Sequence, residues 1–255
     1  MDTLTQRQRS ILQGVVVSHI ETAEPVGSRL LKGHYGLDCS AATVRHEMGF
    51  LEDKGYLTHS HTSSGRLPTD LGYRYYVDHT PDEPMISEER LSQWTEELRE
   101  TADEDLEGCM HRTSNLLSAL SDEVGLLVIR DPWARNPEQE RHKKLVVHGT
   151  VRILEKPEFR DRGKIRELFE AIEEEIELRE WISQRTKDEG VCILIGRENE
   201  PQVLWDCAIV SAPYFKQGKR AGSVAVMGPK RMYYTRMRPL VHQMAEMLES
   251  VLSGR

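Results

Sequence analysis

The 255-residue sequence has no run of about 18 apolar residues, the length that a membrane-spanning helix requires. Its first ten residues, MDTLTQRQRS, lack the apolar core of a secretory signal, so we expect a cytoplasmic protein with no membrane partner. The four cysteines are scattered and form no CxxC pair, which fits free thiols in a reducing compartment. There is no GxSxG, P-loop or HExxH motif. We therefore expect neither an enzyme nor a metal or cofactor site.

Positive charge is also scarce, with 34 Lys and Arg against 42 Asp and Glu and a net charge of -8. The deficit is concentrated in residues 81–125, which carry 3 basic and 13 acidic residues. Such a block is typical of a solvated helix or spacer between two more balanced units. A protein this acidic cannot bind nucleic acid through its overall charge, so any contact with DNA needs a local patch.

The first 80 residues show helical periodicity in three consecutive segments. Apolar residues recur at three- and four-residue steps between Ile11 and Ile20. The second segment is SRLLKGHY (28–35), and the third is AATVRHEMGFLEDK (41–54), which Ser40 can cap. Three short helices joined by turns of a few residues predict a helix-turn-helix bundle.

The third segment separates into two faces. Its apolar residues, Ala41, Val44, Met48 and Leu51, are spaced to pack inward. The first half is otherwise small or polar, as in a helix that places its N-terminal residues against base edges in the major groove. Arg45 can fork onto guanine or grip a phosphate, and His46 can donate to a base acceptor. The candidate recognition residues are Ser40, Ala42, Thr43, Arg45 and His46.

A hairpin is expected directly after this helix, with a strand at 56–58 and a return strand from Leu67. Gly65 would supply a left-handed turn residue at its tip. A hairpin in this position is a wing, and small polar residues at its tip suit phosphate or minor-groove contact. The candidate backbone contacts are Ser28, Arg29, His61, Thr62, Ser63, Ser64, Gly65 and Arg66. Two alternatives stay open: His59 and His61 could pair on a metal, and the whole bundle could bind protein instead of DNA.

These segments resemble the winged-helix domain of the HrcA family of bacterial heat-inducible transcription repressors. The similarity is nearly unbroken over residues 4–78, and HTSSGRLPTDLGYRYYVD (61–78) is its most specific string. LEKPEFRD (154–161), the IG-x-EN segment (195–199) and GPKRMYYTRMRPLV (228–241) resemble the C-terminal part of the same family. His46 stands where the family usually has Asn. The chain is also shortened after residue 131, where most of an inserted dimerising segment is missing.

The resemblance implies a homodimeric repressor that binds CIRCE, an inverted repeat in double-stranded DNA upstream of chaperone operons. It also implies that the GroE chaperonin supports the active state. Residues 40–46 would be recognition-helix positions and residues 61–66 wing positions. The runner-up function is a winged-helix regulator of other genes with a small-molecule sensor domain.

For the whole chain we expect an α+β fold in three parts. These are a winged-helix domain (1–80), an acidic helical connector (81–123) and a GAF-like regulatory or dimerisation domain (124–255). The connector reads as a helix from Ser87 to Leu120 with slips in spacing near Asp105 and Thr113. It could join two DNA-binding heads or pack on its own C-terminal domain.

The C-terminal part predicts an antiparallel sheet, with strands at 124–130, 191–196, 205–214 and 222–228 and a last helix from Met232 onward. Its candidate reactive groups are His148, Asp206, Cys207 and Tyr214, and we expect Cys207 to be an inert buried thiol. The segment GPKRM (228–232) is expected to be a solvated surface turn.

Overall fold

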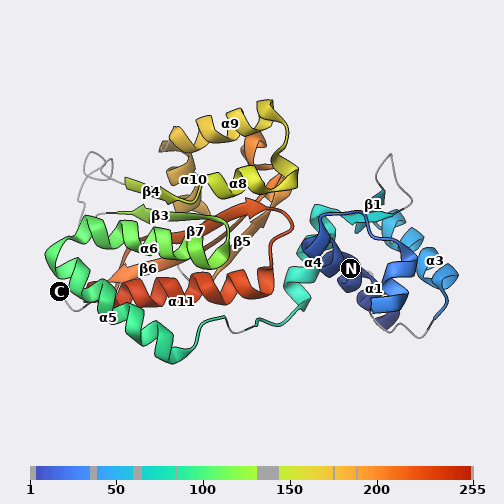
Figure 1. The fold of residues 1–255 in the computed structure, drawn as a ribbon, viewed down its shortest axis with the longest axis horizontal. Helices are drawn as coiled ribbons and strands as arrows, with labels where there is room; N and C mark the ends of the chain where they lie inside the picture. Colours follow the sequence, from blue (N-terminus) through green and yellow to red (C-terminus); the bar gives the residue numbers. More distant parts are fainter. Residues whose placement is uncertain are drawn as a thin grey trace. The chain divides into compact units, whose positions relative to one another are not determined.

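The computed structural model describes residues 4–34, 39–59, 65–83, 85–130, 144–174, 176–187 and 189–253. The chain forms two compact units (Figure 1). Unit 1 consists of Met1–Pro81 together with Lys230–Tyr233, and unit 2 consists of Asp82–Pro229 and Tyr234–Arg255. In the part of the chain that the structure describes, no helix is long and apolar enough to cross a membrane.

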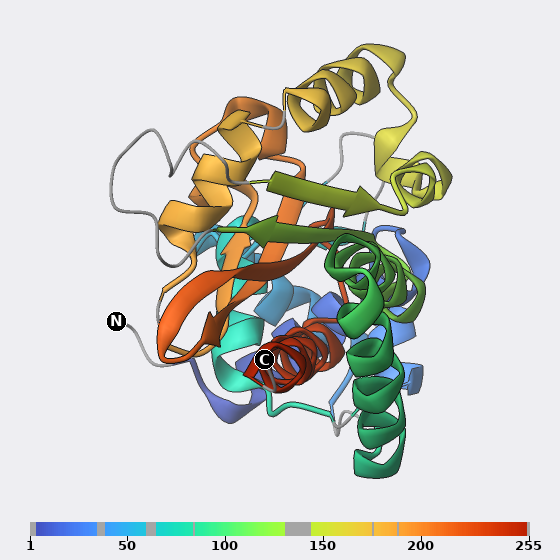
Figure 2. The same cartoon turned by 90° about the vertical axis from the view of Figure 1, so that its left-hand side faces the viewer.

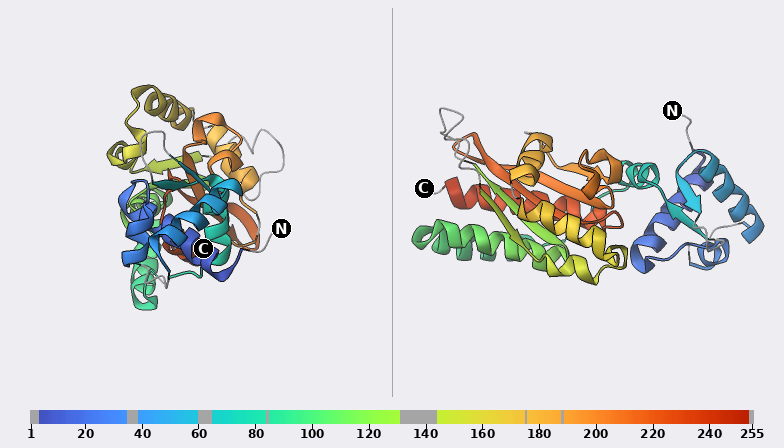
Figure 3. Two further views of the ribbon diagram at one scale, coloured as in Figure 1. Left: turned by 90° about the vertical axis from the view of Figure 1, so that its right-hand side faces the viewer. Right: turned by 90° about the horizontal axis from the view of Figure 1, so that it is seen from above.

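Unit 1 contains helices and one short antiparallel hairpin (Figures 1 and 3). Its elements are α1 (Gln6–Thr22), α2 (Ser28–His34), α3 (Ala41–Asp53), β1 (Leu57–His59), β2 (Arg66–Pro68) and α4 (Asp70–His79). A capping box between Thr5 and Gln8 begins α1, and the Thr69 hydroxyl caps α4. The helices pack around apolar side chains that are almost fully buried, among them Ile11, Val15, Leu31, Leu51 and Tyr73.

Unit 2 is built on one five-stranded sheet whose neighbouring strands are all antiparallel. The strands are β3 (Val124–Ile129), β4 (Lys144–His148), β5 (Cys192–Ile195), β6 (Cys207–Lys216) and β7 (Lys219–Pro229), in the spatial order β4-β3-β7-β6-β5. The sheet and its helices confirm the expected α+β class. Strand β4 lies outside the strands that the sequence pattern predicts, and so do three short 3-10 helices, Pro157–Phe159, Gly196–Glu198 and Gln202–Leu204.

Helices cover both faces of this sheet (Figure 2). On one face lie α5 (Glu88–Glu104), α6 (Leu106–Ser121) and α11 (Tyr234–Ser253). On the other lie α8 (Val151–Glu155), α9 (Arg162–Glu173) and α10 (Ile176–Arg185). The helix expected over 87–120 is broken at Asp105, which has extended backbone angles, at the first slip in the apolar spacing. Within unit 2, α5 and α6 pack on α11, and α6 also packs on β3.

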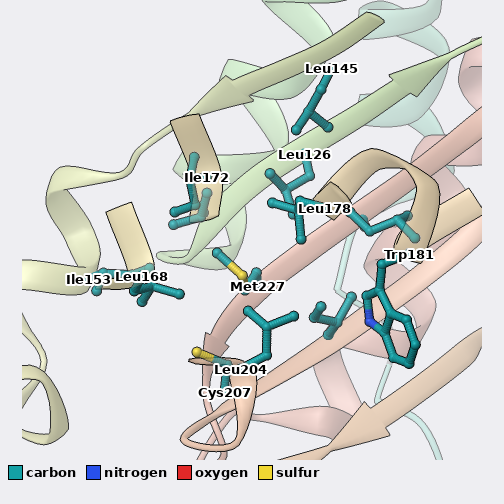
Figure 4. Close-up of a cluster of buried hydrophobic side chains, with 14 of the residues drawn as sticks. Leu126, Leu145, Ile153, Leu168, Ile172, Leu178, Trp181, Leu204, Cys207 and Met227 are labelled. Carbon is teal, nitrogen blue, oxygen red and sulfur yellow. The ribbon is translucent and has the colours of Figure 1, made fainter. Parts of the chain in front are cut away.

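The main core of unit 2 lies between the sheet and helices α8 to α10 (Figure 4). Leu126 and Met227 project from the sheet, while Leu168, Leu178 and Trp181 come from the helices, and each is at most 7% exposed. Cys207 is fully buried in this cluster, as expected for an inert thiol. Packed side chains therefore occupy this face of the sheet.

The segment 228–232 is not a solvated turn, so that expectation was wrong. Met232 is only 1% exposed. Lys230 Nζ lies 2.7 Å from Asp70 Oδ1, and Arg231 Nη1 donates to the Ile20 carbonyl at 3.2 Å. The basic residues of this segment thus complete unit 1 rather than face solvent.

Candidate nucleic-acid interface

The start of α3 is fixed by its own hydroxyl side chains. Ser40 Oγ accepts a hydrogen bond from the backbone N–H of Thr43 at 3.1 Å. The Ser40 and Thr43 hydroxyls also lie 2.9 Å apart. Both side chains therefore stabilise the first turn of the helix on which the other candidate recognition residues stand.

The inner face of α3 attaches it to unit 1. Val44, Met48 and Leu51 are at most 3% exposed, as the spacing predicts. Ala41, which was expected to pack inward with them, is only half-buried. Burial of three large apolar side chains holds this helix in one orientation relative to α1 and α2.

The outer face of α3 is accessible along its length. Ala42, Arg45 and His46 are exposed, and a methyl group added at Gly49 would meet no atom within 4 Å. No hydrogen bond or ion pair to another described residue involves the side chain of Arg45 or His46. In the first half of α3 this face carries the small Ala42 and the polar side chains of Arg45 and His46, so a nucleic-acid groove can approach it closely; further along, Phe50 is exposed as well.

Beside α3 lies a hollow of about 320 Å³ that collects predicted site residues from three elements. Ser28 and Arg29 line it from the start of α2, Arg45 from α3 and Arg66 from β2, together with Gly27 and Met48. Ser28 is only 7% exposed, whereas Arg29 is exposed. The sequence placed Arg45 with the base-reading residues, but the structure places it with the residues expected to grip the backbone.

Arg66 is held in the hairpin by its backbone and by its side chain. Its N–H and C=O exchange hydrogen bonds of 2.9 Å with those of Val26, so β2 pairs with β1 on one side and with Val26 on the other. Its Nε lies 2.8 Å from Glu52 Oε2 at the end of α3. Arg66 was expected at the hairpin tip, but it begins the return strand.

Gly65 was expected to supply a left-handed turn, and this reason was wrong. Its φ lies outside the left-handed region. A Cβ at this position would lie 2.8 Å from backbone atoms of Pro25. Glycine is therefore required here by close approach of two backbones, which no neighbouring residue signals in the sequence.

Glu52 joins α3 to both strands of the hairpin. Its other carboxylate oxygen bonds His59 Nδ1, and His59 is the residue directly opposite Arg66 in the β1–β2 pair. The hydrogen bond with His59, and then the charge of Arg66, hold the pKa of Glu52 below its ordinary value in spite of partial burial. Sequence reasoning missed Glu52, Gly27 and Met48. The seven-residue spacing between Arg45 and Glu52, which puts them on one side of α3, was the available signal.

The remaining predicted contacts of the hairpin tip, His61, Thr62, Ser63 and Ser64, lie outside the described residues. Their assignment to phosphate or minor-groove contact stays a prediction, as does the proposed metal pair of His59 with His61. Among the residues that the structure describes, no group of three or more His, Cys, Asp or Glu side chains could hold a metal ion.

The candidate reactive groups of unit 2 have structural partners. The Tyr214 hydroxyl donates to the Val128 carbonyl at 3.1 Å and is fully buried, which raises its pKa. Asp206 pairs with Lys164 at 2.5 Å. His148 lies against His111 with ring centroids 5.3 Å apart, and burial followed by the charge of His111 lowers the pKa of His148.

Comparison with known protein families matches residues 85–237 to the model described as "HrcA protein C terminal domain". The "Heat-inducible transcription repressor HrcA" of Carboxydothermus hydrogenoformans is 27% identical, with 99% of each chain covered. The protein of the same description from Desulforudis audaxviator is 28% identical, with 98% of each chain covered. These alignments extend over 341 and 340 positions, so both relatives contain segments that this 255-residue chain lacks.

A similar fold occurs in a solved structure described as "Crystal structure of a hypothetical protein at 2.2 A resolution". It has a TM-score of 0.77 and 21% sequence identity, and the match covers 99% of each chain. At this level of identity the similarity concerns the fold.

Proposed function

Because this chain belongs to the HrcA family and is a heat-inducible transcription repressor, we propose that it acts by binding an inverted-repeat operator in double-stranded DNA as a homodimer. Unit 1 makes the contact as a winged-helix domain, with α3 as the recognition helix and the β1–β2 hairpin as the wing. The proposal extends to CIRCE as the operator.

The observation that carries the proposal is the outer face of α3. Its inner face is buried, so the exposed Ala42 and His46 and the half-buried Gly49 form one side of a rigid helix, with Arg45 at the boundary toward the hollow. A recognition helix needs this combination, because base edges can be read only by side chains that are accessible and held in a fixed register. Base contacts are assigned to Ser40, Ala42, Thr43 and His46, and backbone contacts to Ser28, Arg29, Arg66 and the hairpin tip, residues 61–65.

Under this proposal, the residues after the DNA-binding domain connect it to a second domain and regulate it. Residues 81–123 connect the DNA-binding domain (1–80) to a GAF-like regulatory or dimerisation domain (124–255). The five-stranded antiparallel sheet with helices on both faces supports the GAF-like assignment. The GroE chaperonin would support the active state, and the protein would act in the cytoplasm.

DNA binding is tested by fluorescence anisotropy of the full chain with two labelled duplexes. One carries the CIRCE inverted repeat, and the other has the same composition with both half-sites scrambled. We expect tighter binding to the CIRCE duplex by at least about tenfold at 150 mM salt, and a loss of that preference in His46→Ala. Equal affinity of the wild-type chain for both duplexes would contradict sequence-specific binding.

Homodimerisation is tested by sedimentation velocity at micromolar concentration, with and without the CIRCE duplex. An inverted repeat presents two identical half-sites related by a two-fold axis, so a two-fold dimer is expected on the duplex. A single copy bound per intact inverted repeat at saturation would exclude the dimer.

A further inference from the structure

The structure assigns the hollow beside α3 as a pocket for one phosphate group of the DNA backbone, with Arg45 as part of that pocket. This assignment rests on the proposed function and decides between the two roles that the sequence leaves open for Arg45, contact with guanine and contact with a phosphate. The first observation is convergence: Arg29, Arg45 and Arg66 come from α2, α3 and β2, yet all three line the same hollow.

The second observation is the charge of the lining. The other described residues that line the hollow are Gly27, Ser28 and Met48, so three guanidinium groups border it and no carboxylate does. Neither Arg29 nor Arg45 makes an ion pair with another described residue. Arg66 is paired with Glu52, but Arg29 and Arg45 bring two further positive charges to the same hollow, so the three guanidinium groups form a local anion site even in a protein with a net charge of -8.

The third observation is size and polarity. A volume of about 320 Å³ lies at the small end of the range of roughly 300–1,000 Å³ that is typical of ligand pockets. Ser28, which is 93% buried, adds a hydroxyl donor to the lining. The guanidinium groups supply donors in the planar arrangement that suits phosphate oxygens.

The fourth observation is the placement of Arg45 around the helix axis. Arg45, Met48 and Glu52 recur at steps of three and four residues, so they share one side of α3, toward the hollow and the hairpin. His46 and Ala42 share a different, exposed side. Arg45 therefore contributes affinity for the backbone, and the choice of sequence is left to the side that carries Ala42 and His46.

Glu52 fixes one corner of the pocket. It forms an ion pair with Arg66, whose Nε lies 2.8 Å from Glu52 Oε2, and it is hydrogen-bonded at the same time to His59 on the other strand of the hairpin. Glu52 is in this sense a positioning residue, which acts on DNA through Arg66 and not by direct contact.

The test uses the full chain and duplexes that carry a neutral methylphosphonate at one backbone position at a time. In the wild-type chain we expect one position per half-site at which the substitution weakens binding by about tenfold, because one charge-assisted contact is lost. In Arg45→Ala the same substitution is expected to cost less than twofold. An equal loss in the wild-type chain and in Arg45→Ala at every position would overturn the assignment.

A second measurement separates a phosphate contact from base reading. Arg45→Ala is expected to weaken binding to the CIRCE and scrambled duplexes by the same factor and to reduce the salt slope by about 0.9. His46→Ala is the matched control, since it is expected to change the ratio between duplexes and leave the slope unchanged. Loss confined to the CIRCE duplex in Arg45→Ala would show that Arg45 reads a base.

The scrambled duplex also separates failure of this assignment from failure of the proposed function. If the wild-type chain shows no preference for CIRCE, sequence-specific repression is wrong, yet the effect of Arg45→Ala on backbone affinity is still measurable at low salt. In the last experiment, inorganic phosphate is titrated into the protein–DNA complex at constant ionic strength, and competition with the duplex is measured. Competition that is lost in Arg45→Ala supports the pocket as a phosphate site, and competition that persists unchanged argues against it.

Discussion

Two glycines of unit 1 give opposite predictions for the same change to alanine. Gly49 lies in the middle of α3, and a Cβ there meets nothing within 4 Å. Gly72 lies in the first turn of α4, and its Cβ would lie 2.2 Å from the carbonyl oxygen of Tyr56. That oxygen already accepts the Thr69 N–H at 3.0 Å, so it cannot move away without breaking a hydrogen bond.

The magnitudes follow from these surroundings. Alanine is favoured over glycine inside a helix by about 0.8–1.0 kcal/mol, so Gly49→Ala is expected to stabilise unit 1 by roughly that amount. In Gly72→Ala the same gain is offset by an overlap that forces backbone movement, at a cost of about 1–3 kcal/mol or more. We therefore expect net destabilisation of unit 1 by Gly72→Ala.

The assay is urea unfolding of the full chain followed by two probes. All four tryptophans, at positions 94, 133, 181 and 205, lie in unit 2, so their fluorescence reports that unit alone. Circular dichroism at 222 nm reports helices of both units. The Gly49 and Gly72 variants should shift the dichroism curve in opposite directions and leave the tryptophan curve in place. Destabilisation by Gly49→Ala would refute the open surroundings assigned to α3.

Two further predictions concern carboxylates. Glu52→Gln is expected to weaken binding to both duplexes about threefold to tenfold, because it releases Arg66. Glu47→Gln is the control: it makes the same charge change on α3, but the partners of Glu47 are Gln8 and Arg7 on α1, so binding should be unchanged or slightly tighter. Equal effects of the two variants in fluorescence anisotropy would rule out the positioning role of Glu52. In unit 2, burial alone would raise the pKa of Asp122, but the hydrogen bonds and charges of Lys156 and Arg152 outweigh it and hold the pKa below its ordinary value of 3.8. A carboxyl with a lowered folded pKa contributes stability above its unfolded pKa and loses it as pH falls through the folded one. Asp122→Asn should therefore lower the free energy of unfolding by up to about 1 kcal/mol at pH 7, and this deficit should shrink as the pH falls below 3.8. A deficit that keeps its full size in acid urea titrations would argue against this assignment.

The parts of the fold that sequence predicted are those in which local pattern and tertiary packing agree. In α3 the three-four spacing of Val44, Met48 and Leu51 is the same spacing that buries them, so the inner face followed directly. The break between α5 and α6 coincides with a slip in apolar spacing near Asp105, which was visible as an irregularity but not as a helix end.

Strand β4 was missed because its pattern is weak. Of its five residues only Leu145 and Val146 are buried, and the strand lies at one end of the sheet. Strand β4 is defined by its pairing with β3. The paired residues are far apart in the chain, so the sequence around β4 contains no local pattern that predicts the strand.

The candidate site was predictable residue by residue but not in its grouping. Sequence identified Ser28, Arg29, Arg45 and Arg66, since each is a polar side chain next to a helix start or hairpin. Their common hollow, the backbone pairing of Arg66 with Val26 and the anchoring by Glu52 arise from three-dimensional packing. The sequence therefore leaves two roles open for Arg45, base reading and phosphate contact, and only its neighbours in the fold favour the second.

The four residues Lys230–Tyr233 make unit 1 discontinuous in the chain. A fragment that stops at Pro81 would leave Asp70 without Lys230 and the Ile20 carbonyl without Arg231, and it would lack the buried Met232. Unit 1 is consequently incomplete in any fragment that ends at Pro81. During synthesis it reaches its finished form only after almost the entire polypeptide has left the ribosome, so nascent chains would carry an incomplete version of it.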